Sequence, residues 1–251
     1  MTDSVSSIIK QFCEKYKLSL PESALSSFDT LTDELLAYNA HTNLTAVREV
    51  RDIAIKHYAD SLAGGMTGLF TPSEKVLDVG CGAGFPGLPL KIYEPELSVS
   101  FLDSTEKKLK FTSLAAEKLG FSVTTLPMRA EEAAAKKEYR EQFDIVVSRA
   151  MALLPILLEL CLPFVKVGGT FIAYKAAHSA DKEDPESELS RSQKALSALG
   201  GKLEDILYYD LCDFYDGEDD DKKHALLVVK KVRPTPQNYP RRYPQILKKP
   251  L

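Results

Sequence analysis

The sequence predicts an α/β protein built around a mostly parallel β-sheet, and three observations lead to this fold class. Short runs rich in β-branched and aromatic residues recur from residue 75 onwards. Helical stretches separate the earlier runs, as in crossover units whose helices cover both faces of a sheet. A glycine-rich segment directly follows the first run, which is where sheets of this kind bind ligands.

Composition excludes several other classes. The 251 residues are 44% apolar and 27% charged, which is typical of a globular protein and unlike a disordered or fibrous chain. The most apolar stretch, residues 151–165, contains Pro155, Glu159 and Pro163, so no membrane span is predicted. The first ten residues do not resemble a secretory signal, and we expect a cytoplasmic protein. The four cysteines are widely spaced, which favours reduced thiols over disulfides or a zinc site.

Residues 1–70 are expected to form a small helical region. Apolar side chains fall on one helical face in two successive segments, around residues 8–16 and 25–36. Pro21 suits the first turn of the second helix, where its missing N–H costs nothing. A third helix is predicted over residues 51–62, and Gly64, Gly65, Gly68 and Pro72 then interrupt the pattern.

Residues 71–232 are expected to form the sheet domain, with helices over residues 106–119, 129–139 and 186–199. The last two strands are separated by an acidic segment and can pair antiparallel, which predicts a seven-stranded, mostly parallel sheet with an antiparallel C-terminal strand. The seven expected strands cover residues 75–79, 97–103, 121–126, 143–148, 169–175, 202–209 and 224–232.

Charge is distributed unevenly along the chain. The net charge of −4 includes a strongly acidic stretch, residues 181–221, whose segment 210–223 we interpret as an exposed loop. Residues 222–251 carry nine Lys or Arg and no acidic residue. The final part, residues 233–251, is therefore predicted to be a basic, proline-rich tail that binds an anion.

The segment Asp78-Val79-Gly80-Cys81-Gly82-Ala83-Gly84-Phe85-Pro86-Gly87 is the strongest functional signal. Glycines let a backbone turn sharply and approach a ligand closely. The next helix presents free N–H groups to an anionic group of that ligand. Gly82, Gly84 and Gly87 also satisfy the dinucleotide fingerprint, so the glycines alone do not choose between a pyrophosphate and a methionine carboxylate.

Two carboxylates add information about the ligand. Asp103 ends the second strand, where it can accept hydrogen bonds from the ribose hydroxyls of an adenosine, cap the next helix, or do both. Asp78 precedes the first glycine, and its charge suits a cationic ligand such as S-adenosylmethionine better than a pyrophosphate. It would attract that ligand or order the loop that binds it.

Polar residues also follow the later strands, at the edge where open α/β sheets bind their ligands. Arg129, Ala130 and Glu131 follow the third strand, Ser148 and Arg149 end the fourth, and Lys175 ends the fifth. A surface ion pair is the alternative interpretation of Arg129 and Glu131. For Arg149 we favour a role in ligand or substrate binding, since a guanidinium at the rim of a buried strand needs a specific partner. For Lys175 a binding role and a surface contact are both open.

These features together resemble the bacterial ribosomal RNA small subunit methyltransferase G family, also called glucose-inhibited division protein B. The resemblance covers nearly the whole chain and weakens beyond Pro244. The residues that carry it are Tyr38-Asn39-Ala40-His41-Thr42-Asn43-Leu44-Thr45, His57-Tyr58-Ala59-Asp60-Ser61, the glycine loop with Phe85-Pro86, Leu102-Asp103-Ser104, Arg129-Ala130-Glu131, Ser148-Arg149-Ala150, Arg233-Pro234-Thr235-Pro236 and Tyr239-Pro240-Arg241-Arg242.

The resemblance implies a Rossmann-like fold and transfer of a methyl group from S-adenosylmethionine to N7 of one guanine in 16S ribosomal RNA. The donor site is then expected to comprise Asp78, Gly80, Gly82, Gly84, Phe85, Asp103, Ser104, Ala130, Glu131 and Arg149. Asn39, Asn43, His57 and Asp60 also admit a structural interpretation, as side-chain caps and an i, i+3 pair between the N-terminal helices and the sheet. For His57 and Asp60 the structural interpretation is preferred.

Guanine N7 carries an unshared electron pair and no proton, so methylation there needs orientation rather than a base or a metal. We assign positioning roles to Arg149 and Lys175. The partner is expected to be 16S RNA or a small-subunit assembly intermediate, with no membrane and no obligate protein partner. Phosphate contacts are assigned to Arg241, Arg242, Lys248 and Lys249, so deleting residues 233–251 should weaken RNA binding and leave donor binding intact.

Two other classes stay open at this point. A nicotinamide-dependent oxidoreductase is consistent with the glycine pattern and Asp103, although Asp78 disfavours it. A noncatalytic RNA-binding protein with a vestigial pocket is the other alternative. Calorimetry with each cofactor separates the first from a methyltransferase, and methyl incorporation separates the second.

Overall fold

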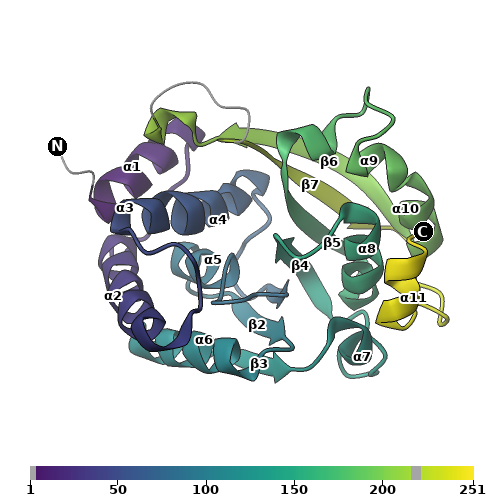
Figure 1. The fold of residues 1–251 in the computed structure, drawn as a ribbon, viewed down its shortest axis with the longest axis horizontal. Coiled ribbons are helices and arrows are strands. Elements are labelled where there is room, and N and C mark those ends of the chain that lie inside the picture. Colours follow the sequence, from purple (N-terminus) through teal and green to yellow (C-terminus); the bar gives the residue numbers. More distant parts are fainter. Residues whose placement is uncertain (1–3, 216–221) are drawn as a thin grey trace.

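A seven-stranded sheet forms the centre of the computed structural model, which describes residues 4–215 and 222–251 (Figure 1). The strand order is β3-β2-β1-β4-β5-β7-β6, and β7 alone runs in the opposite direction to the other six strands. The predicted fold class is therefore confirmed. The strands are β1 (Lys75–Val79), β2 (Ser98–Asp103), β3 (Thr124–Pro127), β4 (Phe143–Arg149), β5 (Val165–Ala176), β6 (Gly201–Asp210) and β7 (Lys223–Lys231).

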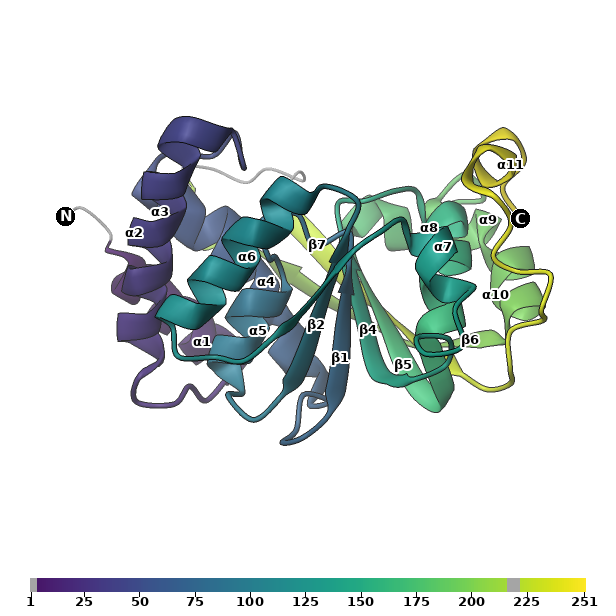
Figure 2. The ribbon, with the colours of Figure 1, turned by 90° about the horizontal axis from the view of Figure 1, so that it is seen from below.

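Helices cover both faces of the sheet, as Figure 2 shows with the sheet nearly edge-on. One face carries α1 (Val5–Tyr16), α2 (Ala24–Thr42), α3 (Val50–Ile53), α4 (Asp60–Leu62), α5 (Gly87–Tyr93) and α6 (Glu106–Lys118). The other face carries α7 (Ala130–Ala134), α8 (Leu154–Cys161), α9 (Glu188–Arg191), α10 (Gln193–Leu199) and α11 (Tyr243–Lys248). Each face has its own buried apolar cluster.

The N-terminal helices form where the apolar spacing predicts them. Ser4 accepts a hydrogen bond from the Ser7 N–H at the start of α1, and Lys17 ends that helix in the left-handed conformation. The buried side chains of Ile8, Phe12 and Phe28 belong to the same apolar cluster as one face of the sheet. The change of pattern near residue 70 thus lies within one continuous core.

The third predicted helix is continuous from α3 to α4, but its middle, residues 54–59, is a π-helical segment. Single π turns inside helices are frequent at functional sites. This one carries His57 and directly precedes Asp60, and both residues line a cavity described below.

Two predicted helices are shorter than expected. The helix predicted over residues 129–139 is only Ala130–Ala134, since Arg129 is extended and turns follow Ala134. The helix predicted over residues 186–199 is divided into α9 and α10 at Ser192. The Ser192 hydroxyl donates to the Glu188 carbonyl at 2.6 Å, a local bond that competes with the regular helical pattern.

Short 3-10 segments complete the fold: Ala63–Thr67 after α4, Leu162–Phe164 before β5, Ala177–Ala180 after β5 and Cys212–Phe214 after β6. The predicted acidic loop, residues 210–223, lies partly outside the described residues, at 216–221. None of the four cysteines, all of which lie within the described residues, forms a disulfide. Within the described ranges, none of the helices has the length and apolarity that a membrane crossing requires.

The C-terminal residues pack on the protein instead of extending from it. After β7 the chain passes back along the face that carries α8, and α11 lies beside α8 (Figure 1). Ile246 is completely buried in the apolar cluster of that face. The segment that the sequence presents as a basic tail, residues 233–251, is thus part of the folded body.

Candidate active site

The glycine loop lies between β1 and α5 and is held by Asp78. This carboxyl is completely buried, and its Oδ2 accepts a hydrogen bond from the Gly87 N–H at 2.8 Å. Burial raises the pKa of Asp78 to about 7, against the opposing effects of the Gly87 hydrogen bond and of Arg149. Of the two roles predicted for Asp78, the contacts support ordering of the loop.

The loop backbone uses conformations that favour glycine. Gly80, Gly82 and Gly84 have φ values of +71°, +56° and +87°. A Cβ at Gly80 would lie 2.7 Å from the Met151 Sδ, whereas a Cβ at Gly82 would meet open space. Gly80 therefore needs to be glycine for both its backbone and its surroundings.

Asp103 joins this loop to the end of β2. Its Oδ2 accepts from the Gly82 N–H at 3.0 Å, and its Oδ1 accepts from the Thr105 N–H at 2.7 Å. Each carboxylate oxygen can accept a further bond, so both can still receive a hydroxyl. The N-cap position of α6 is Thr105, which makes no side-chain cap hydrogen bond, and Asp103 accepts from the Thr105 N–H in the turn before the helix.

A first cavity, of about 270 Å³, lies beside the loop at the carboxyl ends of the parallel strands. It contains five of the residues that the sequence assigns to the donor site, namely Gly80, Asp103, Ser104, Ala130 and Glu131. The structure adds residues that sequence reasoning missed: Lys108, Met128, Ala150, Met151, Leu160 and Tyr243 also line it.

Arg129 and Glu131 form the ion pair that was the alternative interpretation of these two residues. The Arg129 Nε lies 2.8 Å from the Glu131 Oε1, and the Arg129 side chain is about half exposed. The guanidinium also lies 4.9 Å from the centre of the Tyr243 ring. The pair is thus part of the wall of the first cavity as well as a surface contact.

Phe85 lies beside Arg149 and not among the predicted donor residues that line the first cavity. Its ring is buried, stacks on His57 at 4.6 Å between ring centres, and has the Arg149 guanidinium 5.7 Å from its own centre. Like Asp78, Gly82, Gly84 and Arg149, Phe85 is outside the set of residues that line the first cavity. Its position supports Arg149 and His57, so a direct donor contact by Phe85 stays a prediction.

A second cavity, of about 490 Å³, adjoins the first, and Ala150 lines both. Ala150 has a φ of +52°, an unusual backbone conformation for a residue other than glycine and one that is often found at functional sites. Among the residues around this cavity are Asp60, Arg149, Lys175, Glu188, Tyr209 and His224.

Arg149 is fixed in the second cavity by Asp60. The Arg149 Nη1 lies 2.5 Å from the Asp60 Oδ2 and 2.9 Å from the Lys56 carbonyl oxygen. The Tyr209 hydroxyl donates to the other carboxylate oxygen of Asp60 at 2.6 Å, and burial keeps the pKa of Tyr209 well above its usual value. His224 stacks on the Tyr209 ring.

Lys175 is paired as well. Its Nζ lies 2.6 Å from the Glu188 Oε2 and donates to the Ala152 carbonyl oxygen at 3.0 Å. The structure thus brings Arg149 and Lys175 to one cavity, as the sequence predicts for strand ends. Each one is charge-neutralised by a carboxylate that local sequence patterns did not indicate.

The N-terminal motif residues have mainly structural contacts. Asn39 accepts from the Leu44 and Thr45 N–H groups and donates to the Thr45 carbonyl, so it closes the turn after α2. The Asn43 side chain contacts Arg48 at 3.4 Å. His57 and Asp60 were expected to form an i, i+3 pair, but their strong contacts go elsewhere, His57 to the Thr45 hydroxyl and Asp60 to Arg149.

The four predicted RNA-binding cations differ in their surroundings. Arg241 is bound to the buried Glu159, with Nε–Oε1 and Nη2–Oε2 distances of 2.8 and 2.5 Å. This pair occupies the guanidinium, so phosphate binding is a weaker interpretation of Arg241 than support of the fold. Arg242, Lys248 and Lys249 are exposed.

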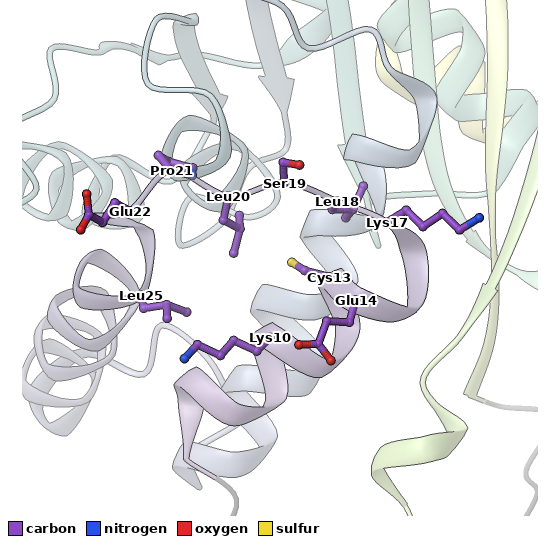
Figure 3. A pocket seen from close by; sticks show the side chains of 10 residues that line it. All are labelled: Lys10, Cys13, Glu14, Lys17, Leu18, Ser19, Leu20, Pro21, Glu22 and Leu25. Atoms are coloured by element: carbon purple, nitrogen blue, oxygen red, sulfur yellow. The ribbon is translucent and has the colours of Figure 1, made fainter.

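Another cavity, of about 550 Å³, lies apart from these two (Figure 3). Its lining residues run from Lys10 to Leu25 and come from α1, the following turn and the beginning of α2. None of the sheet residues or strand-end loops of the first two cavities lines it. We assign it no part in the chemistry.

Comparison with solved structures defines the class of fold. The chain is similar to a Listeria monocytogenes structure described as a putative class I S-adenosylmethionine-dependent methyltransferase, with a TM-score of 0.57 and 13% identity over 82% of this chain and 69% of that one. At this identity the likeness establishes the fold alone. The molecule thus has the Rossmann-like architecture of methyltransferases, with its cavities at the strand ends.

Sequence relatives define the family. The model of the family described as rRNA small subunit methyltransferase G matches residues 24–205. The chain is similar to proteins named Ribosomal RNA small subunit methyltransferase G from Clostridium tetani, at 38% identity over 97% of this chain and 98% of that protein, and from Acetivibrio thermocellus, at 42% identity over 94% and 92%. The chain belongs to this family.

Membership of the family decides among the three classes left open by the sequence. The protein is an enzyme, an rRNA methyltransferase whose methyl donor is S-adenosylmethionine. A nicotinamide-dependent oxidoreductase and a noncatalytic RNA-binding protein are therefore set aside.

Proposed function

We propose that the protein transfers a methyl group from S-adenosylmethionine to N7 of a guanine in 16S ribosomal RNA, with the donor in the first cavity and the base in the second. The observation that carries this proposal is the junction of the two cavities at Ala150. A donor and an acceptor that occupy adjoining cavities can bring their reacting atoms together there.

The first cavity suits the donor. Asp103 has free lone pairs for the ribose hydroxyls, and Gly80 lines the same cavity, where its backbone can approach a methionine moiety closely. Asp78, whose Oδ1 is buried without a hydrogen-bond partner in the described part of the chain, lies in the strand below. When bound, the donor supplies a methyl group activated by a positively charged sulfur.

The second cavity suits a base that becomes cationic. Methylation at N7 leaves a positive charge on the guanine ring, and an unpaired cation beside the ring would oppose the step. In the pairs Arg149–Asp60 and Lys175–Glu188 a carboxylate oxygen lies 2.5–2.6 Å from the nitrogen of the cation, so each positive charge is balanced and repels the methylated ring less. Both side chains can then orient the base through hydrogen bonds, for instance to O6.

The reaction does not need a general base to activate the nucleophile, because the attacking nitrogen carries no proton. Rate enhancement then depends on holding the two reactants in line, for which effective molarities of about 10⁵ to 10⁸ M are known in well-oriented systems. The positioning roles of Arg149 and Lys175 agree with this requirement, since their partners hold both side chains in one place.

The proposed substrate is 16S RNA or a small-subunit assembly intermediate in the cytoplasm. In A-form RNA the groove that exposes N7 is deep and narrow, so the target guanine is expected in a loop or in a region exposed during assembly. Exposed cations of the C-terminal segment, Arg242, Lys248 and Lys249, are proposed to contact phosphates.

The test is methyl incorporation from labelled S-adenosylmethionine into small-subunit RNA from cells that lack this protein. Mass spectrometry of nuclease fragments is expected to locate one added methyl group, on a guanine, with the lability to alkaline treatment that an N7-methyl purine shows. Arg149→Met serves as the variant with reduced transfer, and Leu247→Ala as an exposed control. Methyl incorporation at another atom or base would refute the proposed specificity.

A further inference from the structure

The C-terminal helix α11 forms part of the wall of the first cavity. Tyr243, its first residue, lines this cavity together with Asp103 and Ala130. One face of the Tyr243 ring is covered by the Arg129 guanidinium at 4.9 Å. An aromatic ring in the lining of a ligand cavity offers a stacking surface that none of the predicted donor residues in that cavity provides.

The chain before α11 is fixed to the body by polar contacts, most of them partly buried. Arg140 donates hydrogen bonds to the carbonyl oxygens of Thr235, Pro236 and Tyr239, at 2.8–3.1 Å. The Glu141 Oε1 accepts from the Thr235 N–H at 2.7 Å. Residues 235–239 therefore have little freedom.

A second anchor lies two residues before Tyr243. Glu159 in α8 is completely buried, and Arg241 supplies both side-chain hydrogen bonds and a backbone N–H to it. A buried carboxylate left without its partner is costly, so this pair strongly favours the docked position. Ile246, which lies with Tyr243 on α11, is completely buried.

The position of Tyr243 within the cavity follows from the other residues that line it. Asp103 and Gly80 mark the part suited to the ribose and the methionine moiety. Ala130 begins α7 after β3, and Arg129 directly before it contacts Tyr243. The part of the cavity between Ala130 and Tyr243 thus remains for the third portion of the donor, the planar adenine.

We propose that Tyr243 contacts the adenine of the donor and that the docked C-terminal segment is a structural part of the donor site. The inference rests on the proposed function, and it specifies where the adenine of the methyl donor lies in the first cavity. It also replaces the expectation that residues 233–251 serve RNA binding alone, because their deletion would remove one wall of the first cavity.

Isothermal titration calorimetry of the full-length protein tests the proposal with two ligands, S-adenosylmethionine and 5′-methylthioadenosine, which keeps the adenosine and lacks the amino-acid part. Tyr243→Ala is expected to weaken the binding of both about three- to tenfold, the range for removal of one aromatic stacking interaction. Tyr243→Phe should bind within about twofold of the parent protein, since the ring is kept. Leu247→Ala, an exposed position on α11, is the matched control.

The two ligands and the thermal unfolding of the ligand-free variants separate contact from general damage. A Tyr243→Ala protein that unfolds at the parent temperature and binds both ligands with parent affinity would overturn the proposal. Equal weakening by Tyr243→Ala and Leu247→Ala would also overturn it, since the effect would then belong to the helix. Failure of the parent protein itself to bind S-adenosylmethionine would instead contradict the proposed function.

Discussion

At the scale of single residues, the contacts of Asp60 explain why two distant positions act together. Asp60 lies after the π-helical segment of the N-terminal region, and Arg149 ends β4. Their side chains are 11% and 13% exposed, so the ion pair is largely removed from water. Removing one partner of such a pair leaves an uncompensated charge, which usually costs more than the pair itself contributes.

Arg149→Met is therefore expected to lower the free energy of unfolding by about 3 kcal/mol and to reduce methyl transfer. Adding Asp60→Asn should recover part of this stability, because the unpaired carboxylate is then removed, but should recover no methyl transfer. Urea unfolding of the parent, both single variants and the double variant measures this. Simple additivity of the two single effects would argue against a direct pair.

His57 provides a test in the acidic range. Burial and the charge of Arg149 lower the pKa of His57 to about 4, whereas the unfolded chain keeps a value near the ordinary 6.5. Between these values the unfolded state binds the proton and the folded state does not. The contribution of His57 to stability is therefore fully present above pH 6.5 and is lost as the pH falls towards 4, by about 3 kcal/mol in total.

The measurement compares the parent protein with His57→Gln by urea unfolding at several pH values between about 4 and 7. A comparison is needed because Asp78, whose pKa is raised to about 7, changes stability in the opposite direction over a similar range. The difference in unfolding free energy between parent and variant should grow in favour of the parent as pH rises to 6.5. A difference independent of pH would show that His57 titrates normally in the folded protein.

At the scale of the structural elements, the glycine loop offers a matched pair of substitutions. Gly80 and Gly82 both have a positive φ, so alanine introduces backbone strain of about 1 kcal/mol at either position. Only at Gly80 does the added Cβ also meet the Met151 side chain, at 2.7 Å. Gly80→Ala should therefore destabilise the protein more than Gly82→Ala, by about a further 1 to 3 kcal/mol.

Thermal and urea unfolding of the two variants measure this difference directly. Gly80→Ala should also weaken S-adenosylmethionine binding, since Met151 has to move and it lines the first cavity. Equal stability of the two variants would indicate that Met151 moves aside freely. In that case shape would contribute little to the need for glycine at residue 80.

Prediction from sequence worked best for the elements and for residues fixed by their local position. The strands, the loop and the convergence of Asp103, Ala130 and Glu131 follow from periodicity, glycine spacing and the rule that strand ends meet at one edge. Helix lengths were less accurate, because side-chain bonds such as that of Ser192 end a helix without a strong signal in the pattern.

The parts of the site that could not be predicted depend on contacts between distant segments. Glu188 forms an ion pair with Lys175 across a loop. Tyr209 and His224, from the last two strands, also line the second cavity, and Tyr209 donates a hydrogen bond to Asp60 there. Tyr243 lines the first cavity on a segment that Arg140 and Glu159 fix to the body of the protein. These contacts join segments that are far apart in the sequence, so no local spacing pattern predicts them and only the three-dimensional structure reveals them.

At the scale of the whole molecule, the charge distribution determines how RNA binding should depend on salt. Because the C-terminal segment also carries Tyr243, its deletion would change donor and RNA binding together, and charge substitutions are the better experiment. Arg242→Gln, Lys248→Gln and Lys249→Gln change exposed side chains of this segment while Arg241 keeps its partner.

The triple variant is expected to bind small-subunit RNA more weakly and with a smaller slope of log affinity against log salt. Each phosphate that is no longer neutralised should lower the slope by about 0.7 to 0.9. Filter binding between about 50 and 200 mM salt measures the slope, and calorimetry should show S-adenosylmethionine affinity within about twofold of the parent. An unchanged slope would contradict a role for these cations in RNA binding.

The most direct test of the two-cavity arrangement is a crystal structure of the protein with S-adenosylmethionine bound. We predict that the adenine lies between Ala130 and Tyr243, the ribose hydroxyls contact Asp103, and the donor methyl group points past Ala150 into the cavity that holds Arg149 and Lys175. Density for the donor in the second cavity, or with its methyl group directed away from Ala150, would contradict this account.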